Sequence, residues 1–253
     1  MDKRICVIGG GYWGKNHIKT LHGLGALSGI VDSNEISLKE LLTKYPEVKG
    51  YSDLDEALKD EHSGYIVATP AETHYKISKK IIKAKKHILI EKPMTLSVSH
   101  AEELTRLARE NKINVMVGHV LLFHPAIIKI KDMINKNLIG ELQYIDGRLS
   151  GRRGGLFRNG THLIDAIFYL ADSQPEWVFA ELEKGYEDHT EYRGDGGRTP
   201  ELEPSASGYI HFANGVRGFY TGTSKNTAGP KWRFEVMGSQ GYITIEKEAV
   251  LHR

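Results

Sequence analysis

The sequence predicts an α/β protein in two parts: a parallel sheet flanked by helices, then a part built around antiparallel strands. Short apolar runs alternate with amphipathic segments as far as residue 118, and a glycine-rich stretch follows the first of these runs. After residue 171, runs rich in β-branched and aromatic residues take over. Strands that alternate with helices form parallel sheets with helices on both faces. The change of pattern places a boundary near residue 120, dividing the chain into 1–120 and 121–253.

In the first part, the apolar runs predict strands and the amphipathic runs predict helices. Strands are expected at 4–8, 26–32, 64–70, 87–93 and 113–119, and helices at 12–24, 37–45, 54–60, 72–86 and 97–112. The first helix is expected to end near Gly25, and the second to stop before Pro46. Glycine and proline are typical residues at such boundaries.

The second part is expected to begin with helices and continue as strands. Pro125 is a favoured first-turn residue for a helix. Helices are expected at 125–140 and 160–171, and strands at 141–151, 176–185, 205–213, 215–224, 232–239 and 241–248. Asn214-Gly215 is a hairpin signal, and "MGSQGYI" indicates a second turn. Residues 186–205 form a long polar loop, a length that is uncommon unless the loop is functional or disordered.

Composition excludes some classes of partner. The 253 residues include 34 Lys and Arg against 32 Asp and Glu, a net charge of +2. This balance argues against nucleic acid or a membrane as the main partner, and no apolar run approaches the ~20 residues of a membrane span. The amino-terminal "MDKRICVIGG" lacks the apolar core of a secretory signal. Cys6 is the single cysteine; we expect it in the core of a cytoplasmic protein.

The glycine-rich stretch predicts a dinucleotide site. Gly9, Gly11 and Gly14 fit G-x-G-x-x-G, after a predicted strand and at the opening of a predicted helix. Glycines allow the backbone to approach a pyrophosphate, and the helix N-terminus supplies free N–H groups. Asp32 closes the second strand, where a carboxylate can accept hydrogen bonds from ribose hydroxyls. The alternative is an ordinary glycine turn followed by an Asp that caps a helix.

Asp32 also predicts the choice of cofactor. A 2′-phosphate beside its carboxylate would be repelled by about 4 kcal/mol at ~4 Å in an intermediate dielectric. Ser33 and Asn34 follow, so no neighbouring arginine offsets the repulsion. NAD is therefore favoured over NADP.

Further motifs lie where predicted strands end, the edge at which such sheets bind ligands. They are "ATPAETH" (68–74), "EKP" (91–93) and "GH" (118–119), with "NGTHLID" (159–165) later in the chain. With the glycine loop, they resemble the glucose–fructose oxidoreductase/inositol dehydrogenase (Gfo/Idh/MocA) family of NAD(P)-dependent oxidoreductases, over nearly the whole chain. The resemblance implies an N-terminal Rossmann doubly wound parallel sheet, at 1–120, that binds NAD. It also implies a C-terminal α/β domain with an open, mostly antiparallel sheet, at 121–253, for substrate binding and oligomerisation.

The resemblance implies two catalytic residues. Lys92 of E-K-P would lie beside the nicotinamide and the substrate hydroxyl, placed by Glu91 and by Pro93, whose peptide bond is often cis in the family. His162 would be the acid/base. Alcohol oxidation needs such groups, because a histidine can take the hydroxyl proton near neutral pH and an ammonium can stabilise a developing alkoxide. Taken singly, they would be interpreted as a solvated lysine and a capping or core histidine.

The glycine motif, the charge of Arg158 and the resemblance together predict the binding residues. Those expected to bind the cofactor are Gly9, Gly11, Tyr12, Trp13, Gly14, Asp32, Thr69, Pro70, His74, Glu91 and Lys92. Those expected to contact substrate are His119, Arg158 and Asp165, and no metal site is predicted. His124 could touch substrate or cap the helix that begins at Pro125.

Two features depart from the family pattern. Arg158 stands four residues before His162, where the family often carries Asp, and an arginine cannot act as a base. One explanation is a variant subfamily in which His162 works alone or with Lys92. The other is that Arg158, with Arg152 and Arg153, binds an anionic substrate such as a sugar phosphate, nucleotide-sugar or uronate. The chain is also shorter than common members, as a natural short form or a truncation.

The expected function is NAD-dependent hydride transfer between nicotinamide and a secondary hydroxyl of a sugar, nucleotide-sugar or cyclic polyol. The alternatives are a non-catalytic NAD-binding sensor or regulator of the same fold, and another family reaction such as imine or tetrapyrrole reduction. The open sheet needs cover on its outer face, which predicts a homodimer or homotetramer.

Overall fold

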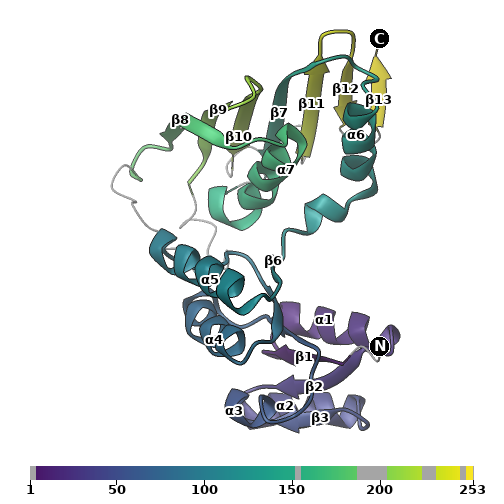
Figure 1. The fold of residues 1–253 in the computed structure, drawn as a ribbon, viewed down its shortest axis with the longest axis vertical. Helices are drawn as coiled ribbons and strands as arrows, with labels where there is room; N and C mark the ends of the chain where they lie inside the picture. The colour runs from purple at the N-terminus through teal and green to yellow at the C-terminus, as the bar shows by residue number, and fades with distance from the viewer. Residues whose placement is uncertain (1–3, 152–154, 187–203, 224–231, 246–248, 253) are drawn as a thin grey trace. The chain divides into compact units, whose positions relative to one another are not determined.

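The computed structural model describes residues 4–151, 155–186, 204–223, 232–245 and 249–252, with the backbone alone at 158 and 249–252. The chain divides into two compact units, Met1–Gly118 and His119–Arg253. Each unit is built around its own sheet (Figure 1).

The first unit holds a six-stranded parallel sheet in the order β3-β2-β1-β4-β5-β6. Its strands are β1 Ile5–Ile8, β2 Leu27–Val31, β3 Lys49–Tyr51, β4 Gly64–Val67, β5 His87–Ile90 and β6 Val115–Val117. This is the strand order of dinucleotide-binding sheets, in which the chain reverses direction of growth beside β1. The predicted parallel sheet is confirmed. β3 was not predicted, because its three residues carry no apolar pattern and pair only with β2.

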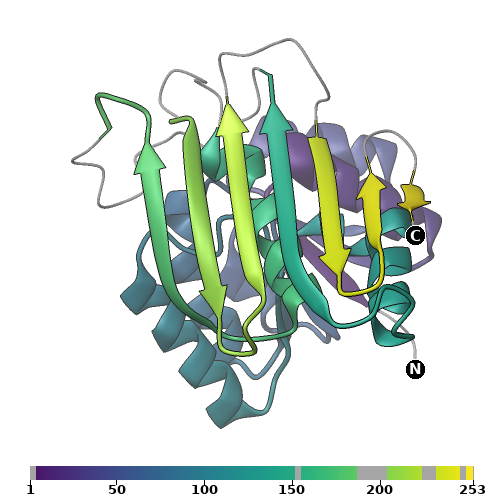
Figure 2. The same ribbon diagram turned by 90° about the horizontal axis from the view of Figure 1, so that it is seen from above.

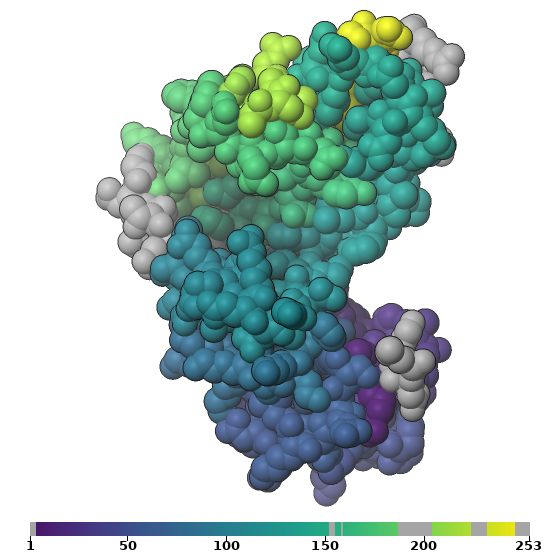
Figure 3. Space-filling view, in the orientation of Figure 1, coloured from purple at the N-terminus to yellow at the C-terminus, as the bar shows by residue number. Residues whose placement is uncertain are grey.

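Helices cover both faces of this sheet. They are α1 Tyr12–Gly23, α2 Glu35–Lys44, α3 Leu54–Ala57, α4 Ala71–Lys83 and α5 Val98–Asn111. The Asn34 side chain caps α2 by accepting a 3.0 Å hydrogen bond from the Ser37 N–H. α4 and α5 pack side by side (Figures 1 and 3). Cys6 is fully buried in the core, as predicted. α3 is shorter than the predicted 54–60.

The second unit holds a seven-stranded mixed sheet in the order β13-β12-β11-β7-β10-β9-β8. Its strands are β7 Leu142–Ser150, β8 Pro175–Leu182, β9 Ala206–Phe212, β10 Arg217–Thr223, β11 Trp232–Gly238, β12 Tyr242–Ile245 and β13 Ala249–His252. β7 and β10 pair parallel, and the other neighbours pair antiparallel. The mostly antiparallel sheet is confirmed, and Asn214-Gly215 makes the predicted hairpin between β9 and β10. The predicted loop falls largely on 187–203, outside the described residues.

Two helices, α6 Pro125–Asn135 and α7 Thr161–Ala171, pack on one face of this sheet. Figure 2 looks onto the opposite face. α6 ends at Asn135 rather than at the predicted 140. A 3-10 turn at Val120–Phe123 and a π-helical turn at Leu156–Gly160, just before α7, were not predicted. Within the described residues, no helix combines the length and the apolar character needed to cross a bilayer.

A buried polar network packs against β2 in the first unit. His62, which is 3% exposed, bonds the Ser28 hydroxyl through Nδ1 at 2.7 Å and the Tyr51 hydroxyl through Nε2 at 3.1 Å. Tyr51 in turn donates to Asp60 at 2.5 Å. Since the Tyr51 proton points to Asp60, Nε2 of His62 carries a proton and Nδ1 accepts from Ser28. Burial lowers the pKa of His62, and the charge of Arg4 lowers it further.

The lowered pKa of His62 predicts acid-sensitive stability. The unfolded state binds a proton near pH 6.5, whereas the folded state keeps the ring neutral to lower pH. The stabilisation is therefore present above about pH 6.5 and is lost as the pH falls toward the folded pKa, with a slope of at most ~1.4 kcal/mol per pH unit. His62→Gln should lower the free energy of unfolding at pH 7.5 and flatten this slope in urea titrations. The surface variant His22→Gln should keep the wild-type slope; equal slopes in wild type and His62→Gln would contradict the prediction.

Candidate functional site

The glycine loop joins β1 to α1 by a close approach of two backbone segments. Gly9 has φ +93°, a conformation that favours glycine. A Cβ added at Gly14 would lie 1.8 Å from the Gly9 carbonyl oxygen, so only glycine fits there. Gly11 is the N-cap of α1 and supplies no side-chain cap, so the first-turn N–H groups are open to a ligand. A Cβ at Gly11 would meet no heavy atom of the described residues within 4 Å. This cradle fits a pyrophosphate.

Asp32 ties this loop to the end of β2. Its Oδ2 accepts a 2.7 Å hydrogen bond from the Gly10 N–H, and its Oδ1 accepts from the Asn34 N–H at 2.8 Å. Asn34, not Asp32, caps α2, so the alternative interpretation of Asp32 as a helix cap is wrong. Oδ1 has a second lone pair for a ribose hydroxyl, while Oδ2 also accepts from the Ser37 hydroxyl at 3.5 Å.

Four other residues predicted to bind the cofactor lie around the glycine loop. Tyr12 and Trp13 are 78% and 49% exposed on the first turn of α1, with ring centroids 5.6 Å apart in an edge-on contact. The Thr69 methyl group packs against Gly9 and would be 3.0 Å from an added Cβ. Pro70 is the N-cap of α4. All four residues therefore lie at the carboxyl edge of the sheet, beside the loop.

The E-K-P motif follows β5 and is held by two histidines. Glu91, 7% exposed, pairs with Nε2 of His17 at 2.7 Å, and its Oε2 accepts a 3.3 Å bond from the Lys92 N–H. His74 lies 2.8 Å from both the Pro93 and the Thr69 carbonyl oxygens. The Lys92–Pro93 peptide is cis.

Sequence reasoning missed His17. It stands three residues after Gly14 in the same helix. Residues three apart share a helix face, so the helix face that meets β1 at Gly14 also carries His17. That spacing was a usable signal.

The second unit brings three predicted residues together at the start of α7. His119 bonds the Thr161 hydroxyl through Nε2 at 3.0 Å and lies 3.2 Å from Asp165 through Nδ1. The rings of His119 and His162 meet edge-on, with centroids 5.7 Å apart. Oδ2 of Asp165 is buried and has no hydrogen-bond partner among the residues that the structure describes. Two imidazoles and a carboxylate in contact can accept, hold and pass a proton.

His124 caps α6, which was one of the two roles expected for it. Its Nδ1 accepts a 3.3 Å hydrogen bond from the Ala126 N–H and caps α6, and its ring packs edge-on against Trp232. The proposed arginine cluster cannot be followed, since Arg152 and Arg153 lie outside the described residues, as does the side chain of Arg158.

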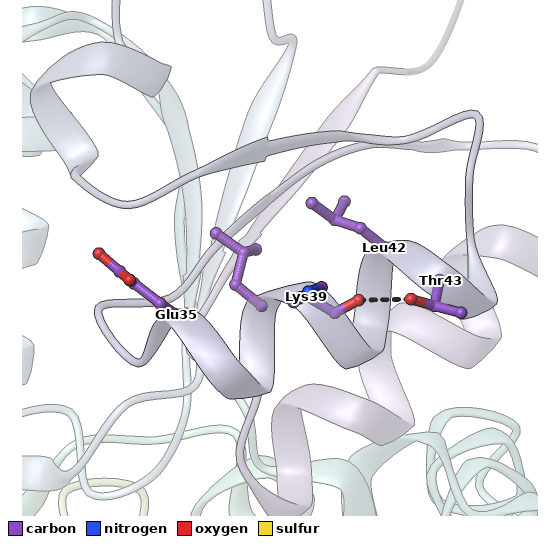
Figure 4. A pocket seen from close by; sticks show the side chains of 5 residues that line it. Glu35, Lys39, Leu42 and Thr43 are labelled. Carbon is purple, nitrogen blue, oxygen red and sulfur yellow. Dashed lines mark hydrogen bonds between the residues drawn. The ribbon is translucent and has the colours of Figure 1, made fainter.

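Lys92 belongs to the first unit and His162 to the second. That Lys92 and His162 lie beside the same nicotinamide ring therefore stays a prediction. Hollows of about 390 Å³ along α2 and about 380 Å³ between α1 and α2 lie in the first unit, and neither is lined by a predicted site residue. Figure 4 shows the one along α2, where the Thr43 hydroxyl donates to the Lys39 carbonyl oxygen.

Known proteins resemble both units. Residues 3–119 match the oxidoreductase family with an NAD-binding Rossmann fold, and residues 127–244 match the GFO/IDH/MocA C-terminal domain. The UDP-N-acetylglucosamine 3-dehydrogenase of Acidithiobacillus ferrooxidans is 32% identical over 49% of this chain and 39% of its own length. The myo-inositol 2-dehydrogenase of Thermotoga maritima is 26% identical over 95% of this chain and 74% of its own length.

Among solved structures, GenD2 from gentamicin A biosynthesis, in complex with NAD, shares the fold with a TM-score of 0.80. It is 24% identical, over 97% of this chain and 73% of its own length. The first of the curated relatives is thus matched over about two fifths of its length and the second over about three quarters.

The two glycine geometries predict different outcomes for two alanine variants. Gly11→Ala places a methyl group in open space over the loop. It should change the melting temperature by only a few degrees, because an N-cap alanine costs roughly 1 kcal/mol or less relative to glycine, while raising the Kd for NAD at least tenfold by blocking the pyrophosphate. Gly14→Ala should instead lower the melting temperature strongly. Thermal unfolding and calorimetric NAD titration measure both; wild-type NAD affinity in Gly11→Ala would contradict the assignment.

Proposed function

The chain belongs to the GFO/IDH/MocA family of NAD-binding oxidoreductases, and we propose that it transfers a hydride between nicotinamide and a secondary hydroxyl of a sugar, nucleotide-sugar or cyclic polyol. One observation carries the proposal: His162, His119 and Asp165 form a proton-accepting cluster at the start of α7. The two curated relatives described above act on a nucleotide-sugar and on an inositol, which supports this substrate class. Neither is described as a sensor or regulator, so no finding favours the non-catalytic alternative.

The cofactor is NAD, held by the glycine loop and Asp32. The open N–H groups of α1 receive the pyrophosphate, and the Asp32 carboxylate receives the ribose hydroxyls. Bound nicotinamide supplies a hydride acceptor for alcohol oxidation, or a hydride donor for the reverse reaction. We propose that residues 1–120 carry this site and 121–253 the substrate site, with Thr69, Pro70, Tyr12 and Trp13 lining the cofactor side.

The protein's own contribution is proton transfer and charge stabilisation. In oxidation, the substrate C–H bond gives up a hydride and the O–H bond gives up a proton, leaving a ketone. We assign the proton to His162, a general base suited to neutral pH. Lys92 stabilises the negative charge that develops on the oxygen. His119, held by Asp165 and Thr161, contacts the substrate and packs edge-on against the His162 ring.

Arg158 is assigned to the substrate rather than to proton transfer. Its guanidinium cannot act as a base, and a planar fork suits a phosphate or carboxylate. We therefore propose an anionic or nucleotide-linked carbohydrate as the preferred substrate, with Arg158 as one contact.

The open face of the second sheet supports a homo-oligomer. Neighbouring strands place Trp177, Tyr209, Phe219 and Tyr144 in an aromatic row across it, with successive centroids 5.0, 5.3 and 5.9 Å apart. Trp177 is more exposed than buried. Contiguous exposed aromatic surface is typical of protein interfaces, and we propose a second copy of the chain as its cover, in a dimer or tetramer. The buried thiol of Cys6 suits a cytoplasmic location.

The catalytic assignment is tested by two variants and a control. His162→Ala and Lys92→Ala should each lower kcat by about 10²–10⁴, the usual effect of a positioned acid/base, with the Kd for NAD nearly unchanged. Lys80→Ala, at an exposed lysine, should keep wild-type turnover. The measurement is NAD reduction followed by nicotinamide absorbance across inositols, sugars, sugar phosphates and nucleotide-sugars. Failure of the whole panel, or full activity without His162, would contradict the proposed function.

Asp32 is expected to set the preference for NAD over NADP. Asp32→Ser removes the charge that repels a 2′-phosphate, so the ratio of the two Kd values should shift toward NADP by roughly 100-fold or more. Glu35→Gln, a nearby change of charge on the first turn of α2, should shift it less than tenfold. Calorimetric titration with both cofactors measures the ratios; an unchanged ratio in Asp32→Ser would show that another group selects the cofactor.

A further inference from the structure

We propose that His17 and His74 are positioning residues that hold Lys92 from both sides, His17 through Glu91 and His74 through Pro93. The importance of this arrangement for turnover rests on the proposed role of Lys92. The arrangement itself rests on contacts within the first unit, and one histidine of the pair has no role in the expectations drawn from the sequence.

The contact on the amino side of Lys92 is a hydrogen bond between the His17 ring and the buried Glu91 carboxylate. The Glu91 carboxylate is almost wholly removed from water, and a buried carboxylate needs a partner. His17 provides it at 2.7 Å, while the Lys92 N–H, at 3.3 Å, is a longer contact. Without His17, the carboxylate would keep only that long contact among those described here, and it would be driven toward solvent.

The surroundings of Glu91 leave its carboxylate little room to move. A Cβ at Gly118 would lie 3.2 Å from the Glu91 carboxyl group, so the carboxylate packs directly on the end of β6. The Glu91 N–H donates to the Val67 carbonyl at 2.9 Å, and the Gly118 N–H donates to the Ile90 carbonyl at 2.8 Å. The backbone before Lys92 is therefore fixed to β4 and β6, and the Glu91 carboxylate is fixed to α1 by His17.

The contact on the carboxyl side of Lys92 is the His74 ring. This residue is 1% exposed, and its two nitrogens lie 2.8 Å from the Pro93 and Thr69 carbonyl oxygens. Both partners are carbonyl oxygens, which accept hydrogen bonds from a ring N–H. The ring thus lies between Thr69, in the loop after β4, and Pro93, in the loop after β5. With both nitrogens engaged and almost no exposed surface, His74 acts through Pro93 rather than by touching the cofactor.

These two contacts link Lys92 to the pyrophosphate cradle. His17 lies on α1, whose first turn holds the glycine loop, and Thr69 packs on Gly9 of the same loop. A displacement of either histidine is therefore passed to the backbone that carries Lys92. Rates can fall by about 10²-fold when a catalytic group moves by about 1 Å.

The test compares shape-retaining and bond-retaining variants. His17→Phe and His74→Phe fill the space without donating hydrogen bonds, and each should lower kcat about 10–100-fold, with KM and the Kd for NAD changed less than threefold. His17→Gln and His74→Gln keep a donor and should recover part of the loss. His22→Phe, an exposed histidine on the same α1, is the control and should keep wild-type turnover.

A second readout does not depend on turnover. An amine-reactive reagent, quantified peptide by peptide by mass spectrometry on the NAD-bound protein, should modify Lys92 at a rate altered at least threefold in both Phe variants. Lys80 should react at the wild-type rate in all of them. If a Phe variant fails to fold by circular dichroism, the Gln variant at the same position carries the same comparison against wild type.

The outcomes separate this proposal from the proposed function. Unchanged Lys92 labelling with unchanged kcat in the four variants overturns the positioning role, as does loss of NAD affinity with unchanged labelling. Wild-type turnover in Lys92→Ala would overturn the proposed catalytic role alone, while altered labelling would still support the two histidine contacts. Altered labelling together with lowered kcat supports both.

Discussion

The close approach of α1 to β1 is the constraint on which the first unit depends. Because Gly14 lies against the Gly9 carbonyl, the helix begins directly over the end of the first strand. Its unpaired N–H groups therefore face the edge at which all six strands end. The same approach brings His17, one turn later, within 2.7 Å of Glu91 at the end of β5. A bulkier residue at position 14 would displace both the glycine loop and the contact between His17 and Glu91.

Polar groups of the first unit serve two different purposes. Against β2, His62, Ser28, Tyr51 and Asp60 satisfy one another in a buried network, so polar groups there serve stability. At the carboxyl end, the first-turn N–H groups of α1 and Oδ1 of Asp32 retain capacity for a ligand. This separation is a general feature of parallel sheets, whose ligands bind beyond the strand ends. It allows the function to change without altering the core.

The second unit contributes its chemistry from one helix terminus. α7 packs an apolar face on the sheet, with Leu163, Ala166 and Ile167 buried, and this leaves Thr161, His162 and Asp165 on its first turns around His119. A π-helical turn precedes it, a feature found frequently at functional sites. The opposite face of the sheet carries the aromatic row, so one sheet separates the surface proposed for catalysis from the surface proposed for assembly.

The sequence by itself determined what is local. Alternating apolar runs gave the strands and helices, the spacing of Gly9, Gly11 and Gly14 gave the cradle, and Asn214-Gly215 gave a hairpin, because each depends on neighbouring residues. Tertiary structure alone decided β3, whose strand pairing comes from β2 rather than from its own pattern. It also decided the pairing of His17 with Glu91 and of His119 with Asp165, across 74 and 46 residues of chain. Such contacts depend on how the helices and strands pack in space. The pattern of residues in one segment does not indicate which distant side chain will lie next to it.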